Sequence, residues 1–558
     1  MKNLFIILFF IPTLFFAQDN IKGMVMEPSP QGKHLPLAGA NVIWEGTSVG
    51  TITDVDGNFI LPYKSSYKRL IISYVGYNLK TIDVKNPNTV IHILLEPTDD
   101  LDEVTVTTRK KASATSYITS QNISFISSKE LLKAACCNLS ESFETNPSID
   151  VNITDAISGT KQIKMLGLTS PYILITTENI PSIRGASQAY GLSFIPGTWV
   201  ESIQITKGAG SVVNGFESIA GQINAELVKP TLDNRIFVNA YGSLNGRTEL
   251  NTHFNTKLSD QWSTGLYVHA DNRSQKFDRN NDSFLDMPLS KQLNIMNRWQ
   301  YSNLQKGLIS FLNVRYLTDE KQSGQLDFDP KTDRLSNTLW GSEVTTKRFE
   351  ISSKFGYVNP EIPYQSLGLQ LSYSNHDQIS YFGLNQYDIH HKSIYSNLVY
   401  NSIISDSRHK IKTGLNATYD DYNETVNSEL YDRNERYIGG FFEYSFDNLE
   451  ALNLTAGIRL DHHNLLGTFV TPRVHARYTP WEKSAFRVSF GRGKRAANIF
   501  AENQKLFATS RTINIQNTGG SIYGLEPEVA WNYGVSFLQG FNLFDRKADF
   551  TIDFYRTD

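Results

Sequence analysis

The chain has 558 residues, a formal net charge of −3 and 40% hydrophobic residues. Its near-neutral balance argues against nucleic acid as a partner, since that function usually needs a basic face, and its length indicates more than one domain. Aromatic residues make up 12% of the chain, with 27 Tyr and 32 Phe. This is high for a soluble enzyme and typical of a membrane β-barrel with aromatic girdles.

The first 17 residues have the pattern of a secretory signal peptide. Lys2 provides a positive start, an apolar run follows from Leu4 to Phe16, and Ala17 is a small residue suited to cleavage. The run is too short to span a membrane as a helix. We therefore expect residues 1–17 to be absent from the exported protein.

Residues 18–98 alternate short β-like runs with turn residues and predict a small β-sandwich. The runs are Ala40–Trp44, Phe59–Leu61 and Leu70–Tyr74. Asp54 and Asp56 lie in a tight turn that ends at Asn58; a structural role in the turn is favoured over a calcium site.

Three pieces of this region resemble the carboxypeptidase-regulatory-like module that precedes many Bacteroidetes receptors. They are the stretches Pro36–Val42, Thr53–Gly57 and Ser73–Tyr77. The resemblance implies no peptidase chemistry.

Residues 99–115 form a linker that contains an extended segment. The segment consists of Leu101, Asp102, Glu103, Val104, Thr105, Val106 and Thr107. An accessible strand of this kind can join the edge of a partner's sheet. The segment resembles the TonB box of outer-membrane receptors, and the alternative is a plain linker of β character.

Residues 116–230 change to a mixed α/β pattern. Helices are expected at Lys129–Ala135 and around Leu139–Glu144, and strands at Gln162–Leu166 and Tyr172–Thr176. The most specific stretch is residues 195–227, where an alternating strand, two glycine turns and a second strand follow one another. Taken in order, these resemble the end of the plug domain of TonB-dependent receptors.

From residue 231 to residue 558, alternating strands of about ten residues recur. In the run from Leu452 to Asp461, for example, apolar residues alternate with polar ones, so one face suits hydrocarbon and the other suits water. Thr471–Arg473 and Leu525–Glu528 resemble recurrent signatures of receptor barrels.

We count about 15 strands, whereas the receptor barrels that this region resembles have 22. An open sheet edge cannot face lipid, because its backbone groups would lack partners. We therefore expect the barrel to be incomplete at its C-terminal end, with about seven more strands in a longer protein.

Together these regions predict a mainly β protein: an N-terminal β-sandwich, an α/β plug and an antiparallel transmembrane β-barrel. The resemblance implies a place in the outer membrane with the N-terminal domain in the periplasm. It also implies as partners TonB with its inner-membrane energising complex, the outer-membrane lipid and a small nutrient ligand.

One segment has the spacing of a metal-binding loop. Asp278, Asn280, Asp282 and Asp286 match oxygen positions 1, 3, 5 and 9 of an EF-hand-type calcium loop. However, the usual glycine is Ser283 and position 12 is Leu289. A calcium site and a solvated polar loop are both open, and no cofactor is otherwise required.

Two further sets of residues have ligand chemistry. Cys136 and Cys137 are the only cysteines, and either bind a soft metal such as copper or simply pack. The pairs His390–His391 and His462–His463 either line a substrate vestibule or belong to the barrel rim. Because neighbouring side chains in a strand point to opposite faces, each pair offers one inward imidazole.

The sequence shows no nucleophile with a base, no phosphate loop and no zinc spacing, so no enzyme activity is expected. The resemblance implies active import of a scarce nutrient, and the alternatives are a ligand-sensing signalling or interaction receptor and a SusC-like glycan importer. Glycan importers carry an L-G-R-x-x-G-V-x-V stretch where this chain has residues 139–151 without it. The difference favours an iron-siderophore, a metal complex or cobalamin.

Overall fold

The computed structural model describes two compact units, Met1–Val106 and Thr107–Asp558. The described residues are 20–28, 34–47, 49–54, 56–74, 77–84, 86, 89–96, 113–116, 118–133, 138–144, 146, 148–153, 159, 161–448, 451–511, 513–544 and 546–558. No helix among them is both long and apolar enough to cross a membrane.

The first unit is a β-sandwich of two four-stranded sheets. One sheet has the order β2-β1-β5, with β8 also on β1, and the other has the order β4-β3-β6-β7. The strands are β1 (Asn20–Pro28), β2 (His34–Pro36), β3 (Asn41–Trp44), β4 (Gly50–Ile52), β5 (Asn58–Pro62), β6 (Arg69–Ser73), β7 (Lys80–Asp83) and β8 (Ile91–Leu94). Buried Val42, Trp44 and Phe59 belong to its core. The Asp54 carboxylate accepts the backbone N–H groups of Asp56 and Asn58, at 3.0 and 2.7 Å, and so closes the expected turn.

The second unit begins with the plug. Its main sheet has the order β15-β14-β17-β16-β10-β9, and a smaller sheet has the order β11-β12-β13. The strands are β9 (Ser113–Thr115), β10 (Asn122–Ser127), β11 (Asp150–Ile153), β12 (Lys161–Met165), β13 (Leu168–Thr169), β14 (Ile173–Thr177), β15 (Ile180–Ile183), β16 (Val200–Lys207) and β17 (Gly221–Leu227). Short helical turns connect them: α1 (Ser128–Lys133), η2 (Glu141–Phe143), η3 (Ser170–Tyr172), η4 (Gly185–Ser187), η5 (Gly191–Phe194), η6 (Gly197–Trp199) and η7 (Val212–Asn214).

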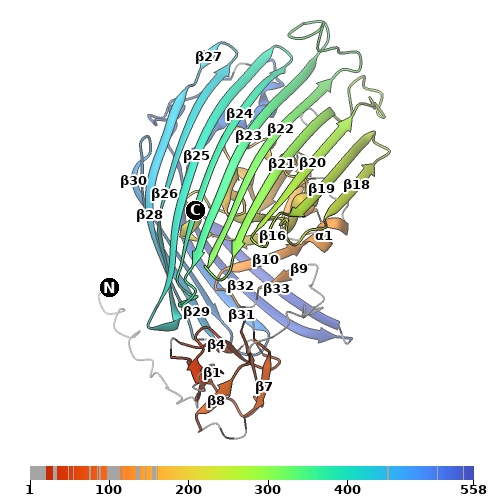
Figure 1. Cartoon of the computed structure of the whole chain (residues 1–558). Coiled ribbons are helices and arrows are strands. Elements are labelled where there is room, and N and C mark those ends of the chain that lie inside the picture. Colours follow the sequence, from red (N-terminus) through yellow and green to blue (C-terminus); the bar gives the residue numbers. More distant parts are fainter. Residues whose placement is uncertain are drawn as a thin grey trace, which may run out of the picture. The chain divides into compact units, whose positions relative to one another are not determined.

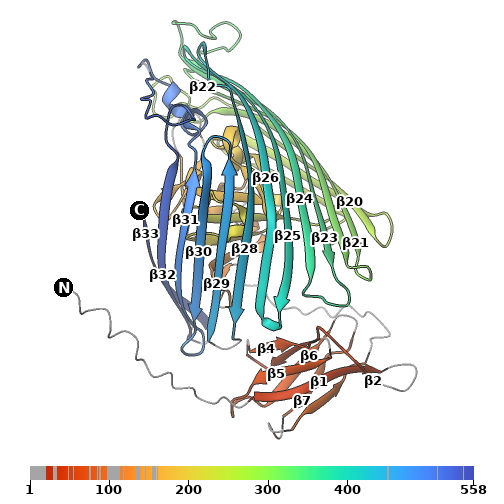
Figure 2. The ribbon, with the colours of Figure 1, turned by 90° about the vertical axis from the view of Figure 1, so that its left-hand side faces the viewer.

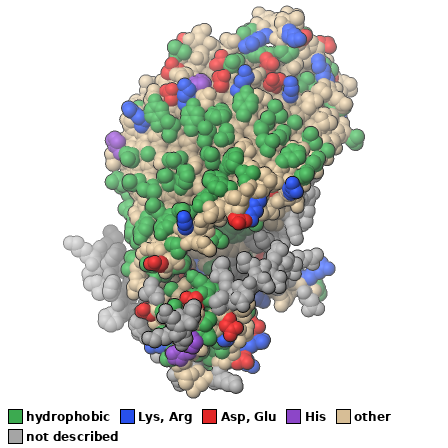
Figure 3. All heavy atoms as spheres, viewed as in Figure 1, with side chains coloured by type: hydrophobic (Ala, Val, Ile, Leu, Met, Phe, Trp, Pro, Cys, Tyr) green, Lys and Arg blue, Asp and Glu red, His purple; other side chains and the backbone are tan. Residues whose placement is uncertain are grey.

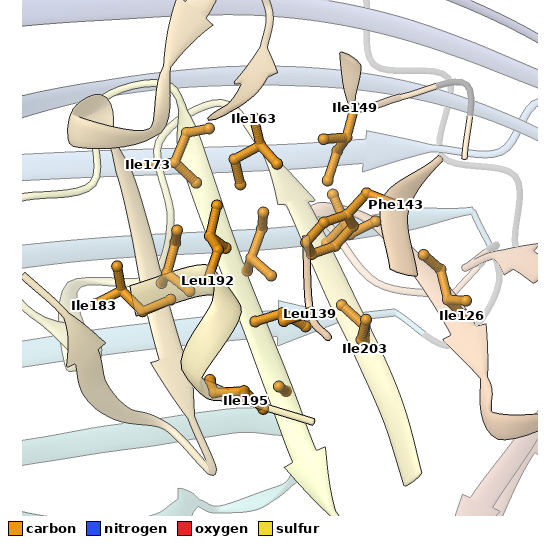
Figure 4. Packing of buried hydrophobic residues seen from close by; sticks show 14 of the residues in the cluster. Ile126, Leu139, Phe143, Ile149, Ile163, Ile173, Ile183, Leu192, Ile195 and Ile203 are labelled. Carbon is orange, nitrogen blue, oxygen red and sulfur yellow. The ribbon is translucent and has the colours of Figure 1, made fainter. Parts of the chain in front are cut away.

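The plug has its own apolar core, built mostly from isoleucines of its strands (Figure 4). Ile126, Ile163 and Ile203 are almost completely buried there, together with Leu139 and Phe143 of the connecting segments. The helix predicted around residues 139–144 is only the single 3₁₀ turn η2. The Asn138 side chain accepts the N–H groups of the two residues that open this turn, Ser140 and Glu141.

A single antiparallel sheet curls around the plug (Figures 1 and 2). In the part of the chain that the structure describes it has sixteen strands, fifteen in one path from β18 to β33, with the two-residue β27 paired to β26. The strands are β18 (Ile236–Gly242), β19 (Arg247–Lys257), β20 (Trp262–Arg273), β21 (Leu289–Asn303), β22 (Leu308–Gly324), β23 (Gly341–Val358), β24 (Ser366–Phe382), β25 (Asn385–Ile404), β26 (Asp406–Val426), β27 (Glu429–Leu430), β28 (Arg433–Asp447), β29 (Leu452–His463), β30 (Gly467–Tyr478), β31 (Ser484–Arg495), β32 (Glu528–Leu543) and β33 (Arg546–Thr557). The prediction of about 15 barrel strands is confirmed, and the expectation of further strands stays a prediction.

The two faces of each strand differ as their alternation predicts. In β29, Ile458 and Leu460 are 53% and 55% exposed, whereas Arg459 and Asp461 between them are fully buried. Figure 3 shows apolar side chains spread over the middle of the outward face, with charged side chains gathered toward one end. The outward face therefore suits lipid, and the inward face contacts the plug.

The connections at the two ends of the sheet differ in length. At one end they are short, such as residues 258–261 and 304–307, and at the other end they include residues 274–288, 325–340 and 496–527. In bacterial barrels the short turns are periplasmic and the long loops extracellular. We call the long-loop end the outer end.

Candidate functional site

The plug presents η4 and η5 toward the outer end, where they meet the inner wall of the sheet. At Gly185, φ is +56° and a Cβ atom would lie 2.7 Å from the Tyr422 hydroxyl and 2.8 Å from His391 Cε1. A side chain here would therefore meet both backbone strain and a clash. This glycine lets the plug apex touch strands β25 and β26.

An ion pair fixes the apex at the same point. The Arg184 guanidinium donates two hydrogen bonds to the Asp420 carboxylate, each 2.9 Å long, and His391 Nε2 lies 2.9 Å from the same carboxylate. Burial opposes the charge of Arg184, but Asp420 and Glu217 outweigh it and raise the pKa of the guanidinium well above its usual range. Arg184 thus stays charged and holds the plug to the wall.

Next to this contact the outer mouth is filled by the chain itself. The connection of residues 496–527, with α2 (Ile499–Glu502) and η8 (Gln504–Phe507), folds onto the plug apex and strands β24–β28. Phe507 stacks on Tyr387 at 5.2 Å between ring centroids, and Phe500 packs against Tyr523 at 5.3 Å. We call this connection with its aromatic contacts the aromatic half of the mouth.

Arg433 joins the aromatic half to the wall. Its guanidinium lies 3.9 Å from the Tyr422 ring centroid and 4.7 Å from that of Tyr523. It also forms ion pairs of 2.8 Å with Glu424 and with Glu435. The Tyr523 hydroxyl donates to Glu424 at 2.5 Å, and burial together with that carboxylate raises the pKa of Tyr523. Two carboxylates and two aromatic rings therefore surround the Arg433 guanidinium and compensate its charge.

On the other side of the apex the mouth contains a polar cavity of about 120 Å³. Its walls are plug segments near Glu141, Lys161 and Ser193 and the inward side chains of β19–β22. We call this side the polar half. Its carboxylates are paired with cations, since Glu141 lies 3.3 Å from Lys161 Nζ and 2.8 Å from Arg247 Nη1.

Deeper in the lumen, polar and charged contacts hold the plug against the wall. Glu178, in the turn between β14 and β15, forms a buried ion pair with Arg298 of β21. At the opposite edge of the plug sheet, the Asn122 amide donates to Ser536 at 3.2 Å and to Asp553 at 3.1 Å. An interface of this composition separates at a smaller cost than a continuous apolar core, because water can solvate its groups.

Three family descriptions match consecutive parts of the chain. They are "CarboxypepD_reg-like domain" at residues 21–106, "TonB-dependent Receptor Plug Domain" at residues 116–222 and "TonB dependent receptor-like, beta-barrel" at residues 228–558. The last of these covers more than half of the chain. The chain belongs to the TonB-dependent receptor family. The receptor barrel fold implies a place in the outer membrane.

Curated relatives of this receptor match over limited stretches. TonB-dependent receptor SusC of Bacteroides thetaiotaomicron is 39% identical over 92 residues, which are 16% of this chain and 8% of the relative. TonB-dependent receptor P39 of Formosa agariphila is 24% identical over 218 residues, 37% of this chain and 19% of the relative. The matched stretches thus span a fifth or less of these relatives' lengths.

Solved structures share the receptor fold at low sequence identity. The siderophore receptor PirA from Acinetobacter baumannii has a TM-score of 0.61 at 14% identity and covers 78% of this chain and 70% of its own. The copper transporter OprC has a TM-score of 0.59 at 13% identity and covers 77% of this chain and 70% of its own. At these identities the likeness shows the fold alone.

Two predicted sites of the receptor lie outside the described residues. They are the TonB-box-like segment from Leu101 to Thr107 and the pair Cys136–Cys137. Their roles stay predictions.

The histidine pairs each place one imidazole inward. His391 and His463 are 2% and 3% exposed and face the plug side, whereas His390 and His462 point away from it. His391 packs against Gly185 of the plug and lines a cavity of about 90 Å³ below the apex. His391 therefore contacts the plug, whereas His463 contacts Glu435 and Tyr437 of β28.

The calcium-type segment lies in the outer connection between β20 and β21. The Asp278 carboxylate accepts the backbone N–H groups of Asp282 and Ser283, at 3.1 and 2.9 Å, and Asp286 accepts that of Arg279. Among the described residues no three His, Cys, Asp or Glu side chains are grouped so as to hold a metal ion. Calcium binding by Asp278, Asn280, Asp282 and Asp286 stays a prediction.

Sequence reasoning missed the charged residues that organise the mouth, notably Arg184, Asp420 and Arg433. The inward direction of Asp420 could have been predicted, because it lies on the same face of β26 as Thr418 and Glu424, which are also buried. Arg184 lies in an irregular plug segment, where no alternation could have marked it.

Proposed function

We propose that this receptor imports a scarce nutrient across the outer membrane by TonB-dependent active transport. The observation that carries the proposal is the plug, which fills the barrel lumen and is held there by ionic and polar contacts such as Arg184–Asp420. A plug of this kind closes the pore at rest and has to be remodelled for each transported ligand. The outer mouth would bind the ligand, and no covalent chemistry is assigned to the protein.

In this proposal TonB pairs with the segment from Leu101 to Thr107 and pulls it from the periplasm, using the inner-membrane proton-motive force. The segment precedes β9 and β10, which form one edge of the plug sheet. Force applied there acts first on an edge, where β9 pairs with a single neighbour. Energy from the inner membrane would thus reach the plug through an edge of its main sheet.

Iron-siderophore, metal-complex and cobalamin import are the leading substrate classes. Solved structures of the same fold are titled siderophore receptor and copper transporter, so the first two classes are compatible with a receptor of this fold. SusC-like glycan import is the second candidate, because a relative of that name is 39% identical over 92 residues. A signalling role is less well supported, because the N-terminal module is of the carboxypeptidase-regulatory-like kind.

A proline substitution tests the proposed transport. Val104→Pro removes a backbone donor and disfavours strand pairing, and Lys110→Pro is the matched control in the same linker. We expect Val104→Pro to abolish energised uptake while surface binding of the nutrient persists, and Lys110→Pro to transport normally. Uptake and growth under iron, copper or cobalamin limitation are the measurements. Normal transport by Val104→Pro would show that the segment is only a linker.

A further inference from the structure

Two of the six methionines of the chain lie on the outward face of one strand of the N-terminal sandwich. In β1, Ile21 and Val25 point into the core, whereas Met24 and Met26 alternate with them and are half-buried on the opposite face. Because the two methionines are two residues apart in a strand, their Cα atoms are about 7 Å apart. Both thioethers therefore lie on the side of this sheet that faces away from the core.

A histidine of the neighbouring strand lies beside the two methionines. Strand β8 runs parallel to β1, and the register places His92 directly beside Met24. Adjacent strands are about 5 Å apart, so Met24, Met26 and His92 start from a triangle with sides of about 5, 7 and 8 Å. His92 is exposed, and within the described residues its ring has no hydrogen-bond or ion-pair partner. We call these three residues the methionine–histidine cluster.

The positions next to this cluster suit a soft, weakly charged ligand. In the described part of the sheet, the register positions beside the methionines hold Asn58 of β5 and Pro36 of β2, so no carboxylate stands directly beside the cluster there. The carboxylate of Glu27, near the end of β1, accepts a hydrogen bond from the Tyr77 hydroxyl. Lys22, the preceding outward residue of β1, is exposed. A lysine and the lack of an adjacent carboxylate both disfavour a hard divalent cation.

We infer that Met24, Met26 and His92 form a binding site for a soft monovalent cation, Cu(I). Thioether and imidazole ligands are neutral and suit Cu(I), whereas Mg²⁺, Ca²⁺ and Mn²⁺ need carboxylate, carbonyl or water oxygens. Zn²⁺ sites use thiolates, imidazoles and carboxylates, and the cluster offers one imidazole. Methionine has three rotatable bonds, so each sulfur can turn over the face toward the imidazole. The site belongs to the N-terminal unit and goes beyond the proposed import function.

The test measures Cu(I) binding by the purified receptor in detergent, prepared without a histidine tag. All proteins carry Cys136→Ser and Cys137→Ser, because these thiols could bind the same metal. We call this protein the thiol-free receptor. Bicinchoninate competes for Cu(I) under ascorbate without oxygen, and its colour reports the copper that the protein leaves behind. Ag(I) serves as a second soft probe that needs no reductant, and Zn(II) serves as the contrasting metal.

The variants change the cluster and two similar residues elsewhere in the chain. Met24→Leu, Met24→Leu combined with Met26→Leu, and His92→Gln remove ligands of the cluster. The matched controls are Met287→Leu and His462→Gln, which replace a half-buried methionine and an exposed histidine outside the N-terminal unit. Leucine is close to methionine in volume, so the sandwich should keep its fold. Circular dichroism and urea unfolding verify that it does.

We expect the thiol-free receptor to bind a single Cu(I) or Ag(I) ion and to bind Zn(II) much more weakly. Loss of an outer-shell partner alone lowers metal affinity about tenfold to hundredfold. Removal of a direct ligand in Met24→Leu or His92→Gln should therefore weaken Cu(I) binding at least about tenfold, and the double methionine variant should weaken it further. Both controls should bind as the thiol-free receptor does. X-ray absorption at the copper edge should show two sulfur ligands, and one fewer in Met24→Leu.

Three results would overturn the inference. They are failure of the thiol-free receptor to compete for Cu(I), unchanged Cu(I) affinity in the double methionine variant, and bound copper without sulfur ligands. The last of these is decided on the thiol-free receptor itself, so it holds even where a variant does not fold. Because the measurement involves no transport, its failure leaves the import function standing. Normal uptake by Val104→Pro would in turn leave the Cu(I) site standing.

Discussion

The two halves of the outer mouth are built from the same alternating strands but end in opposite states. In the aromatic half, residues 496–527 fold back onto β24–β28 and cover the wall with rings. In the polar half, β19–β22 leave a cavity beside the plug apex. Among the described residues, one half is covered by residues 496–527, and the other half contains a cavity.

The two halves differ in how the charges of their arginines are compensated. Arg433 has two carboxylates and two aromatic faces around it. Arg273 instead faces Arg247 and forms no ion pair within the described residues. Residues that serve the fold satisfy one another, and the facing pair Arg247–Arg273 departs from that rule. The predictions below test this distinction by removing one arginine at a time.

The largest effect is expected for Arg433→Leu in the aromatic half. Loss of the guanidinium leaves Glu424 and Glu435 as buried, uncompensated charges, at a cost of about 3–5 kcal/mol. Residues 496–527 should then detach from the wall and become accessible. Limited proteolysis of the purified receptor measures this exposure, and urea unfolding in detergent measures the stability.

The matched control is Arg436→Leu, three residues along the same strand, whose side chain is exposed. It should leave both the cleavage pattern and the unfolding midpoint unchanged. Equal protection of residues 496–527 in Arg433→Leu and wild type would show that contacts other than those of Arg433 hold this connection, such as the ring contacts and the Asn385 amide bonds to Phe507 and Thr509.

The fold was largely predictable from the sequence, because strand alternation is a local signal. Ile458 is apolar and Arg459 is charged, so the sequence predicts that Ile458 faces outward and Arg459 faces the lumen. The structure places both side chains as expected. The glycine turns of the plug were also predictable, since Gly208 and Gly215 have φ values of +78° and +113°. Helices were less well predicted, since the short plug segments are fixed by tertiary contacts instead of by periodicity.

The mouth was not predictable from local patterns. Arg247 and Arg273 become neighbours only through the register of the β19–β20 pair. Phe507 meets Tyr387 across a long stretch of sequence, and only the folded 496–527 connection brings them together. Alternation marks a side chain as inward, but it does not say which inward side chains meet.

An intermediate effect is expected for Arg247→Gln in the polar half. This substitution removes contacts with Glu141, Glu249 and Asp271, and loss of charged hydrogen bonds in a partly exposed site costs about 1.5–3 kcal/mol. The urea midpoint of the purified receptor should fall accordingly. An unchanged midpoint would mean that these carboxylates find solvent or other partners, and that Arg247 contributes little to the fold.

The smallest effect, and the most informative, is expected for the stability of Arg273→Gln. Because Arg273 faces a like charge and has no ion-pair partner among the described residues, its replacement by a neutral side chain of similar reach should raise the unfolding free energy by about 0.2–1 kcal/mol. The sign distinguishes the two arginines, since Arg247→Gln should destabilise the ligand-free receptor while Arg273→Gln stabilises it. Urea unfolding at low and high salt measures both, and the gain for Arg273→Gln should shrink as salt screens the repulsion. A loss of stability in Arg273→Gln would show that this arginine has a structural partner. The charges of the polar half would then be compensated within the protein, as they are in the aromatic half.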